Sequence, residues 1–149
     1  KFDSAGHFLF AWGSHGTAGG QFDIPHAIDL DSAGNVYVAD RGNHRVQAFT
    51  SHGHLLQMWA DSSMADLYAV AIDPTRDQAI AVDYLKRDTT FLGSDVWLLS
   101  PTSVLSHFGR SDHACDKPSR YHDLVVDEEG SIYVGDILGD RVQKWALRK

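Results

Sequence analysis

Three side chains at equivalent places in the sequence could bind a metal or move a proton. They are His26, Tyr68 and His122, each standing five residues before an aspartate. Neutral imidazole nitrogens bind Zn²⁺ at about 2.0–2.1 Å, so the two histidines would form part of a zinc site if the fold brings them together. A third ligand would still be needed. The alternative is a structural role, in which each histidine hydrogen-bonds the backbone of a neighbouring unit.

These residues recur because the chain repeats itself. Residues 26–31, 35–40 and 45–49 read HAIDLD, NVYVAD and RVQAF, and residues 122–127, 131–136 and 141–145 read HDLVVD, SIYVGD and RVQKW. A more divergent copy lies between them, at 68–73, 79–83 and 96–100. Repetition of this kind indicates supersecondary units that must stack on one another to bury their apolar faces.

Each unit is predicted to be four antiparallel strands. Apolar residues alternate with small or polar ones, as in Val36-Tyr37-Val38, which is the period of a strand. Between the first two strands, Asp31 and Gly34 have the chemistry of a hairpin turn. A fourth strand follows, and its Gly53 and Trp59 restate Gly6 and Trp12, which stand 47 residues earlier in the chain.

The spacing of the units favours a β-propeller. Asp40 precedes Asp83 by 43 residues, within the ~40 to 50 residues of one four-stranded blade. Asp136 follows 53 residues after Asp83, so the middle unit carries extra residues, expected in loops at 86–95 and 110–120, where a binding surface could form. We therefore expect an all-β chain of three four-stranded blades. The single domain 1–149 would comprise a lone strand at 7–12 and units at about 24–60, 67–109 and 120–149.

Three blades are half of a six-bladed ring, and propellers close with ~4 to 8 blades. An open arc would leave apolar blade faces and unpaired strand edges in water. Either the chain is half of a longer protein, or two copies associate and the amino-terminal strand of each completes the last blade of the other. We favour the homodimer for a chain that stands alone, since two-fold symmetry is the commonest oligomer symmetry.

Composition excludes several classes of partner. The 149 residues carry 13 basic and 20 acidic side chains, a net charge of −7 with no clustered basic stripe, which argues against nucleic acid and anionic membranes. No apolar run approaches the ~20 residues of a membrane span. The sequence begins inside a repeat, so no signal peptide is visible and the compartment is not indicated. Cys115 is the only cysteine, so no disulfide forms within the chain.

Two sets of motifs resemble known families. Residues 40–49, DRGNHRVQAF, look like an NHL repeat. Residues 20–26 (GQFDIPH), 38–41 (VADR), His122-Asp123 and 132–136 (IYVGD) resemble, in this order, the carboxy-terminal half of the peptidyl-α-hydroxyglycine α-amidating lyases. The similarity spans nearly the whole chain.

The lyase resemblance implies a six-bladed propeller that cleaves peptidyl-α-hydroxyglycine to peptide amide and glyoxylate, with zinc held by three histidines from alternate blades. It implies that His26 and His122 bind zinc, that Asp123 binds a calcium ion in the channel, and that Arg41 contacts the substrate carboxylate through its planar fork. Tyr68 would line the channel. A non-catalytic NHL module that binds a peptide or a small molecule is the alternative.

The sequence also departs from the lyase pattern. The third zinc histidine, the tyrosine proposed as base, a second arginine and the disulfides of that family have no counterpart here, and Arg120-Tyr121 replace an apolar residue and a proline. A homodimer would place two histidines side by side rather than three on alternate blades. Tyr84, which follows Asp83, is a remote candidate for the base.

Other recurring residues are interpreted as structural. Asp40 and Asp136 each precede an arginine by five residues, at Arg45 and Arg141, and are expected to stabilise a tight turn and pair with that arginine. The four tryptophans recur at strand positions and are expected to pack between blades.

Overall fold

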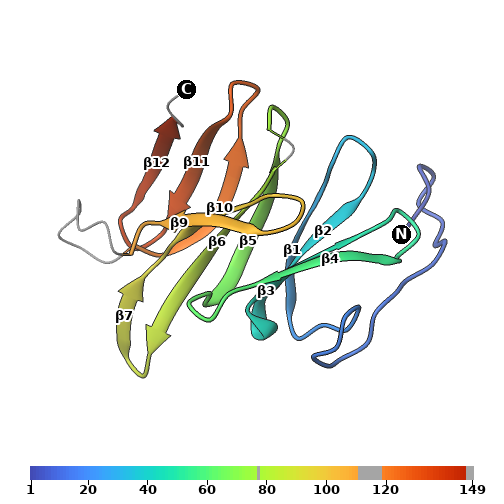
Figure 1. Ribbon diagram of the computed structural model, residues 1–149, viewed down its shortest axis with the longest axis horizontal. Helices are drawn as coiled ribbons and strands as arrows, with labels where there is room; N and C mark the ends of the chain where they lie inside the picture. The colour runs from blue at the N-terminus through green and yellow to red at the C-terminus, as the bar shows by residue number, and fades with distance from the viewer. Residues whose placement is uncertain (77, 111–118, 147–149) are drawn as a thin grey trace.

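The structure is a computed structural model that describes residues 1–76, 78–110 and 119–146. It is built from three antiparallel sheets that stand side by side (Figure 1). The first sheet comprises β1 (Pro25–Leu30), β2 (Val36–Asp40), β3 (Arg45–Phe49) and β4 (Leu55–Ala60), with one 3₁₀ turn, η1 (Arg41–Asn43), between β2 and β3. None of the described residues form a helix long and apolar enough to cross a membrane.

The second and third sheets repeat the order of the first. The second comprises β5 (Asp66–Asp73), β6 (Gln78–Arg87), β8 (Val96–Leu99) and β9 (Val104–Phe108), and the short β7 (Thr90–Gly93) pairs with an extension of β6. The third comprises β10 (Tyr121–Val126), β11 (Ser131–Asp136) and β12 (Arg141–Ala146). The first strands β1, β5 and β10 contact one another in that order, as inner strands of successive blades do. The all-β fold is confirmed.

Apolar side chains fill the two spaces between neighbouring sheets. Val46 and Trp59 of the first sheet pack against Leu67 and Trp97 of the second. On the other side of the second sheet, a matching cluster joins it to the third; its members include Ala69, Ile80, Val96, Leu124 and Ile132. Each fully buried aliphatic side chain contributes about 1.5–3 kcal/mol, so stacking of the sheets is the main source of stability. Trp59, Trp97 and Trp145 pack between sheets, as expected, whereas Trp12 packs against the first sheet alone.

Hairpin turns follow the predicted chemistry. The Asp31 carboxylate accepts hydrogen bonds from the backbone N–H groups of Ala33 and Asn35, at 2.9 and 2.8 Å. Gly34 has a φ of +80°, which a side chain would strain. The same turn recurs where Asp127 accepts from the N–H of Ser131 at 2.8 Å.

Two expected elements differ from the sequence prediction. Residues 7–12 join no sheet; Phe8 forms only an isolated bridge with Phe2. The physical reason is that a fourth strand needs a third strand beside it, and the free edge of β12 lies at the opposite end of the molecule (Figure 1). Residues 86–95, expected as a loop, instead continue β6 and form β7, because Lys86 and Arg87 pair with Phe91 and Thr90. The other expected loop, 110–120, lies mostly outside the described residues.

Candidate functional site

The same backbone irregularity occurs at the start of all three inner strands. In β1, β5 and β10 the register with the second strand shifts by one residue, and the residues at the shift are His26, Tyr68 and His122. A β-bulge leaves its extra residue unpaired and re-aims the side chain, and bulges are common beside functional sites. The repeat therefore directs the three equivalent side chains by one device.

The three rings lie together at one end of the inner strands, which we call the channel mouth. Ring centres are 4.9 Å apart for His26 and Tyr68, 5.3 Å for Tyr68 and His122, and 5.7 Å for His26 and His122. Tyr68 is buried, His26 is half-buried and His122 is exposed. The fold thus brings the three rings together at one place.

One hydrogen bond fixes the chemistry of His26. Its Nδ1 lies 2.7 Å from the backbone carbonyl oxygen of Tyr68, in the neighbouring sheet. A carbonyl oxygen can only accept, so Nδ1 carries the proton and, in the neutral ring, Nε2 is the bare nitrogen. This is the structural bond to a neighbouring blade that the sequence allowed as an alternative. It is also the orienting bond that metal-binding histidines usually make with their other nitrogen.

Arg41 is part of the same cluster. Its guanidinium carbon lies 4.5 Å from the centre of the Tyr68 ring, within the range of a cation–π interaction. Its Nη2 lies 3.4 Å from Asp66, which also faces His44 at 3.4 Å. The side chain of Arg41 is half-buried.

A second arginine approaches Tyr68 from the third sheet. The guanidinium carbon of Arg120 lies 5.5 Å from the Tyr68 ring and 4.9 Å from the Tyr84 ring. Its Nη2 donates to the Tyr68 hydroxyl at 3.3 Å. In the described part of the chain, Arg120 Nε and the Tyr84 hydroxyl are buried without a hydrogen-bond partner. Burial raises the pKa of Tyr84, and the nearby Arg120 charge only partly opposes it.

Sequence reasoning missed Arg120 and gave Tyr84 little weight. The signal lies in the repeat register, because Tyr84 follows Asp83 as Arg41 follows Asp40, although Arg41 begins η1 after β2 and Tyr84 lies within the longer β6. Arg120 precedes β10 as Asp66 precedes Leu67 in β5. Equivalent contacts result in the two neighbouring pairs of sheets: Arg41 contacts Asp66, and Tyr84 contacts Arg120.

The aspartates at the ends of the second strands are structural. Asp40 pairs with Arg45 at 2.8 Å and Asp136 with Arg141 at 3.0 Å, as the sequence predicts. Burial raises the pKa of Asp136, but hydrogen bonds from the backbone of Arg120 and Gly139 and from two side chains outweigh it, so the pKa is lowered overall. For Asp83, burial outweighs the Arg110 charge and raises the pKa.

Metal donors at the mouth are incomplete among the residues that the structure describes. The described residues contain no group of three histidine, cysteine, aspartate or glutamate side chains that could hold a metal ion. Asp123 lies next to His122 on β10 and is exposed, and its Oδ1 accepts the N–H of Leu124 at 2.9 Å. It provides a single carboxylate, whereas calcium takes six to eight oxygen ligands.

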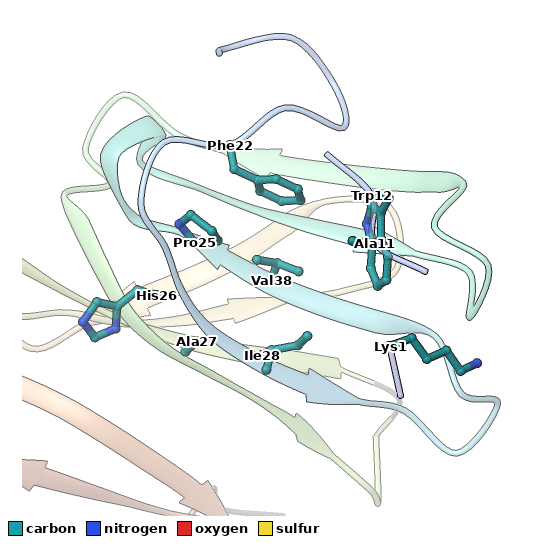
Figure 2. Close-up of a pocket in the computed structure, with 9 residues that line it drawn as sticks. All are labelled: Lys1, Ala11, Trp12, Phe22, Pro25, His26, Ala27, Ile28 and Val38. Atoms are coloured by element: carbon teal, nitrogen blue, oxygen red, sulfur yellow. The ribbon is translucent and has the colours of Figure 1, made fainter. Parts of the chain in front are cut away.

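A cleft opens beside the mouth on the outer face of the first sheet. Its volume is about 370 Å³, and its walls are mainly apolar, formed by residues of the amino-terminal segment and of β1 and β2. Figure 2 shows His26 at one end of this cleft and Lys1 at the other. The indole Nε1 of Trp12, in the wall, is buried and has no hydrogen-bond partner among the described residues.

Comparison with known proteins agrees with this architecture. Residues 22–49 match the NHL repeat. A solved protein of unknown function from Bacteroides caccae superposes with a TM-score of 0.51 at 15% sequence identity, covering 74% of this chain and 37% of that one, which shows the likeness of fold alone. The three stacked sheets, together with the register shift repeated at the start of each inner strand, define an NHL-type β-propeller chain.

Two named relatives cover nearly the whole chain. NHL repeat-containing protein 3 of Homo sapiens is 33% identical over 144 residues, which is 93% of this chain and 40% of that protein. Peptidyl-glycine alpha-amidating monooxygenase of Mus musculus is 27% identical over 154 residues, 99% of this chain and 15% of that protein. The chain is an NHL-repeat protein, spans about two fifths of the first relative, and is distantly similar to the second.

Proposed function

We propose that the channel mouth binds zinc through His26 and His122 and that the bound metal serves lyase-like chemistry, the cleavage of a peptidyl-α-hydroxyglycine. The observation that carries this proposal is the 2.7 Å bond from His26 Nδ1 to the Tyr68 carbonyl, with the His122 ring 5.7 Å away. That bond leaves His26 Nε2 bare. Two imidazoles that share one zinc at about 2.0–2.1 Å have ring centres roughly 5 Å apart, close to the separation here.

The donor set fits zinc in part. Two imidazoles are present, and a third ligand would have to come from outside the residues described. Zinc, when bound, would polarise a substrate hydroxyl as a Lewis acid. The protein's own residues would bind and orient the substrate: the Arg41 fork, held over the Tyr68 ring, suits a carboxylate. Calcium at Asp123 remains a weaker proposal, since that residue supplies one carboxylate.

A second candidate is a non-catalytic NHL module that binds a peptide or small ligand at the same mouth. It is favoured by the higher identity to NHL repeat-containing protein 3, at 33% against 27% for the amidating monooxygenase. Both proposals predict a ligand at the mouth, but only the first requires turnover.

Calorimetry with Zn²⁺ separates these proposals from a purely structural role of the histidines. We expect the intact chain to bind zinc, and His26→Ala and His122→Ala each to weaken that binding at least tenfold. His52→Ala, in an exposed turn of the first sheet, is the matched control and is expected to bind as the unaltered chain does. Turnover of a peptidyl-α-hydroxyglycine by zinc-loaded protein supports lyase chemistry; zinc binding without turnover supports the binding module. Equal affinity in all variants would refute the site.

A further inference from the structure

The two contacts that join neighbouring sheets at the channel mouth differ in charge. Between the first and second sheets, Arg41 Nη2 lies 3.4 Å from a carboxylate oxygen of Asp66. Between the second and third sheets, Tyr84 takes the place of Arg41 and Arg120 takes the place of Asp66. The first contact therefore pairs a cation with an anion, whereas the second brings a cation to an aromatic ring, 4.9 Å from its centre, and supplies no carboxylate.

No described acidic side chain balances the charge of Arg120. None of the ion pairs between described residues includes Arg120, although they engage five other arginines: Arg41, Arg45, Arg76, Arg110 and Arg141. The Asp136 carboxylate accepts only the backbone N–H of Arg120, at 2.9 Å, and pairs with the Arg141 side chain instead. The Arg120 guanidinium contacts the Tyr68 hydroxyl and the rings of Tyr68 and Tyr84. A half-buried charge with neutral partners alone is costly, and an anion would offset that cost.

Two polar atoms beside this charge also have no hydrogen-bond partner among the described residues. They are the buried Nε of Arg120 and the buried hydroxyl of Tyr84, a residue that is only 4% exposed. Buried polar groups of native proteins are nearly all hydrogen-bonded, so two unpaired ones in one contact need an explanation. An N–H and an O–H can both donate to a carboxylate oxygen, and such charge-assisted bonds are the stronger kind.

Arg41 lies within reach of the same ligand. The guanidinium carbons of Arg41 and Arg120 lie 4.5 and 5.5 Å from the centre of the Tyr68 ring, so they are separated by at most about 10 Å, the sum of the two distances. Adjacent residues of a peptide have Cα atoms about 3.8 Å apart, so a terminal carboxylate and an acidic side chain one residue before it are roughly 5–9 Å apart. One short peptide can therefore place a carboxylate at each arginine.

We propose that Arg120 and Tyr84 form a second carboxylate site at the channel mouth, which selects peptides whose penultimate residue is aspartate or glutamate. The terminal carboxylate binds Arg41, as in the proposed function, on which this inference rests. The acidic side chain binds Arg120 and takes the place that the Asp66 carboxylate occupies beside Arg41. A terminal hydroxyglycine has no side chain that could carry the second charge, so that charge comes from the residue before it.

Calorimetry with a matched pair of peptides tests this selectivity. Acetylated Ala-Glu-Gly and Ala-Gln-Gly, each with a free terminal carboxylate, have nearly the same shape and differ by one charge. We expect the intact chain to bind the glutamate peptide at least tenfold more tightly. Arg120→Met removes the charge but keeps a long unbranched side chain, and should bring the ratio of the two dissociation constants close to one. Arg87→Met, which removes an exposed charge from the end of β6, is the matched control and should leave that ratio unchanged.

A structural role of Arg120 predicts a different result from the same variants. If Arg120 only joins the two sheets, Arg120→Met should lower the melting temperature and leave the ratio of the dissociation constants as it is in the unaltered chain. That result would overturn the second carboxylate site. Arg120→Lys keeps the charge without the planar fork, and is expected to retain part of the preference for the glutamate peptide.

The outcomes also separate this inference from the proposal that it extends. Equal affinity of the intact chain for the two peptides, with both lost in Arg41→Met, would overturn the second site and leave the first in place. Failure of both peptides to bind would overturn both sites. Inorganic phosphate is titrated in the same way, because a free oxoanion offers Arg120 the same chemistry. Phosphate binding that Arg120→Met abolishes, without any preference for the glutamate peptide, would assign the site to a free anion and overturn its role in peptide selection.

Discussion

His26 Nδ1 donates a hydrogen bond of 2.7 Å to the carbonyl oxygen of Tyr68, and the donor and the acceptor sit on equivalent bulged residues of neighbouring blades. The bond joins the two sheets and also sets the tautomer of the imidazole. His26 therefore makes a structural contact and at the same time presents an unprotonated ring nitrogen at the channel mouth.

Removing the hydroxyl of Tyr84 is expected to stabilise the protein. Among the described residues that hydroxyl is buried without a hydrogen-bond partner, and a buried unpaired polar group costs about 1–3 kcal/mol. Tyr84→Phe should raise the free energy of unfolding in urea by up to about 1 kcal/mol. Tyr68→Phe is the matched comparison and should lower it, because the Tyr68 hydroxyl accepts a bond from Arg120. Loss of stability in Tyr84→Phe would show that its hydroxyl has a partner.

Loss of the indole N–H should lower stability by different amounts at Trp59 and Trp97, which pack between the first and second sheets. Trp97 donates to the Asp83 carboxylate at 2.9 Å, and Trp59 donates to the backbone carbonyl of Ser100 at 2.8 Å. Hydrogen bonds to charged groups contribute about 1.5–3 kcal/mol against roughly 1 kcal/mol for neutral ones. Trp97→Phe should therefore destabilise more than Trp59→Phe, by about 1 kcal/mol, in chemical denaturation. Equal losses would contradict this assignment of the donors.

Acid should act in opposite senses through the two buried aspartates. The pKa of Asp136 is lowered from the usual 3.8, so its carboxylate stabilises the fold above pH 3.8, and that contribution is lost as the pH falls toward the lowered value. The pKa of Asp83 is raised above 3.8, so the cost of its charge is present above the raised pKa and is relieved as the pH falls from there toward 3.8.

These signs can be separated by unfolding each protein between pH 6 and pH 2.5. The stability of the unaltered chain relative to Asp136→Asn should decrease below pH 3.8, whereas its stability relative to Asp83→Asn should increase as the pH falls toward 3.8. Parallel pH profiles for the two variants would contradict the opposite pKa shifts. The comparison uses only the slopes, since each asparagine also weakens the hydrogen bonds that its aspartate accepts.

Much of the fold can be predicted from the sequence because each blade contains its own strand and turn signals. The alternation around Tyr37, the Asp31 turn and the recurring tryptophans predict four-stranded units, and the common five-residue spacing to an aspartate predicts that His26, Tyr68 and His122 are equivalent. Residues 7–12 were assigned to a strand on the same grounds. Their pattern specifies a strand, but none of the described strands places a free edge beside them.

The part of the mouth that sequence reasoning did not find depends on contacts between blades. Arg120 contacts Tyr84 and Tyr68 of the preceding sheet; the repeat register aligns Arg120 with Asp66 and Tyr84 with Arg41, but how closely these side chains approach depends on how the sheets stack. The β6–β7 hairpin was also missed, because Lys86 and Arg87 have polar side chains that indicate a loop, although their backbone groups pair with Thr90 and Phe91. Backbone pairing at an exposed hairpin requires no apolar pattern.

X-ray absorption at the zinc edge, on zinc-loaded protein, tests most directly whether His26 and His122 share one metal ion. We predict nitrogen neighbours at about 2.0–2.1 Å with the outer-shell scattering of at least two imidazoles, and the loss of one imidazole from that shell in His122→Ala. A shell of oxygen atoms only, or a spectrum that neither His26→Ala nor His122→Ala changes, would contradict a metal site at the channel mouth.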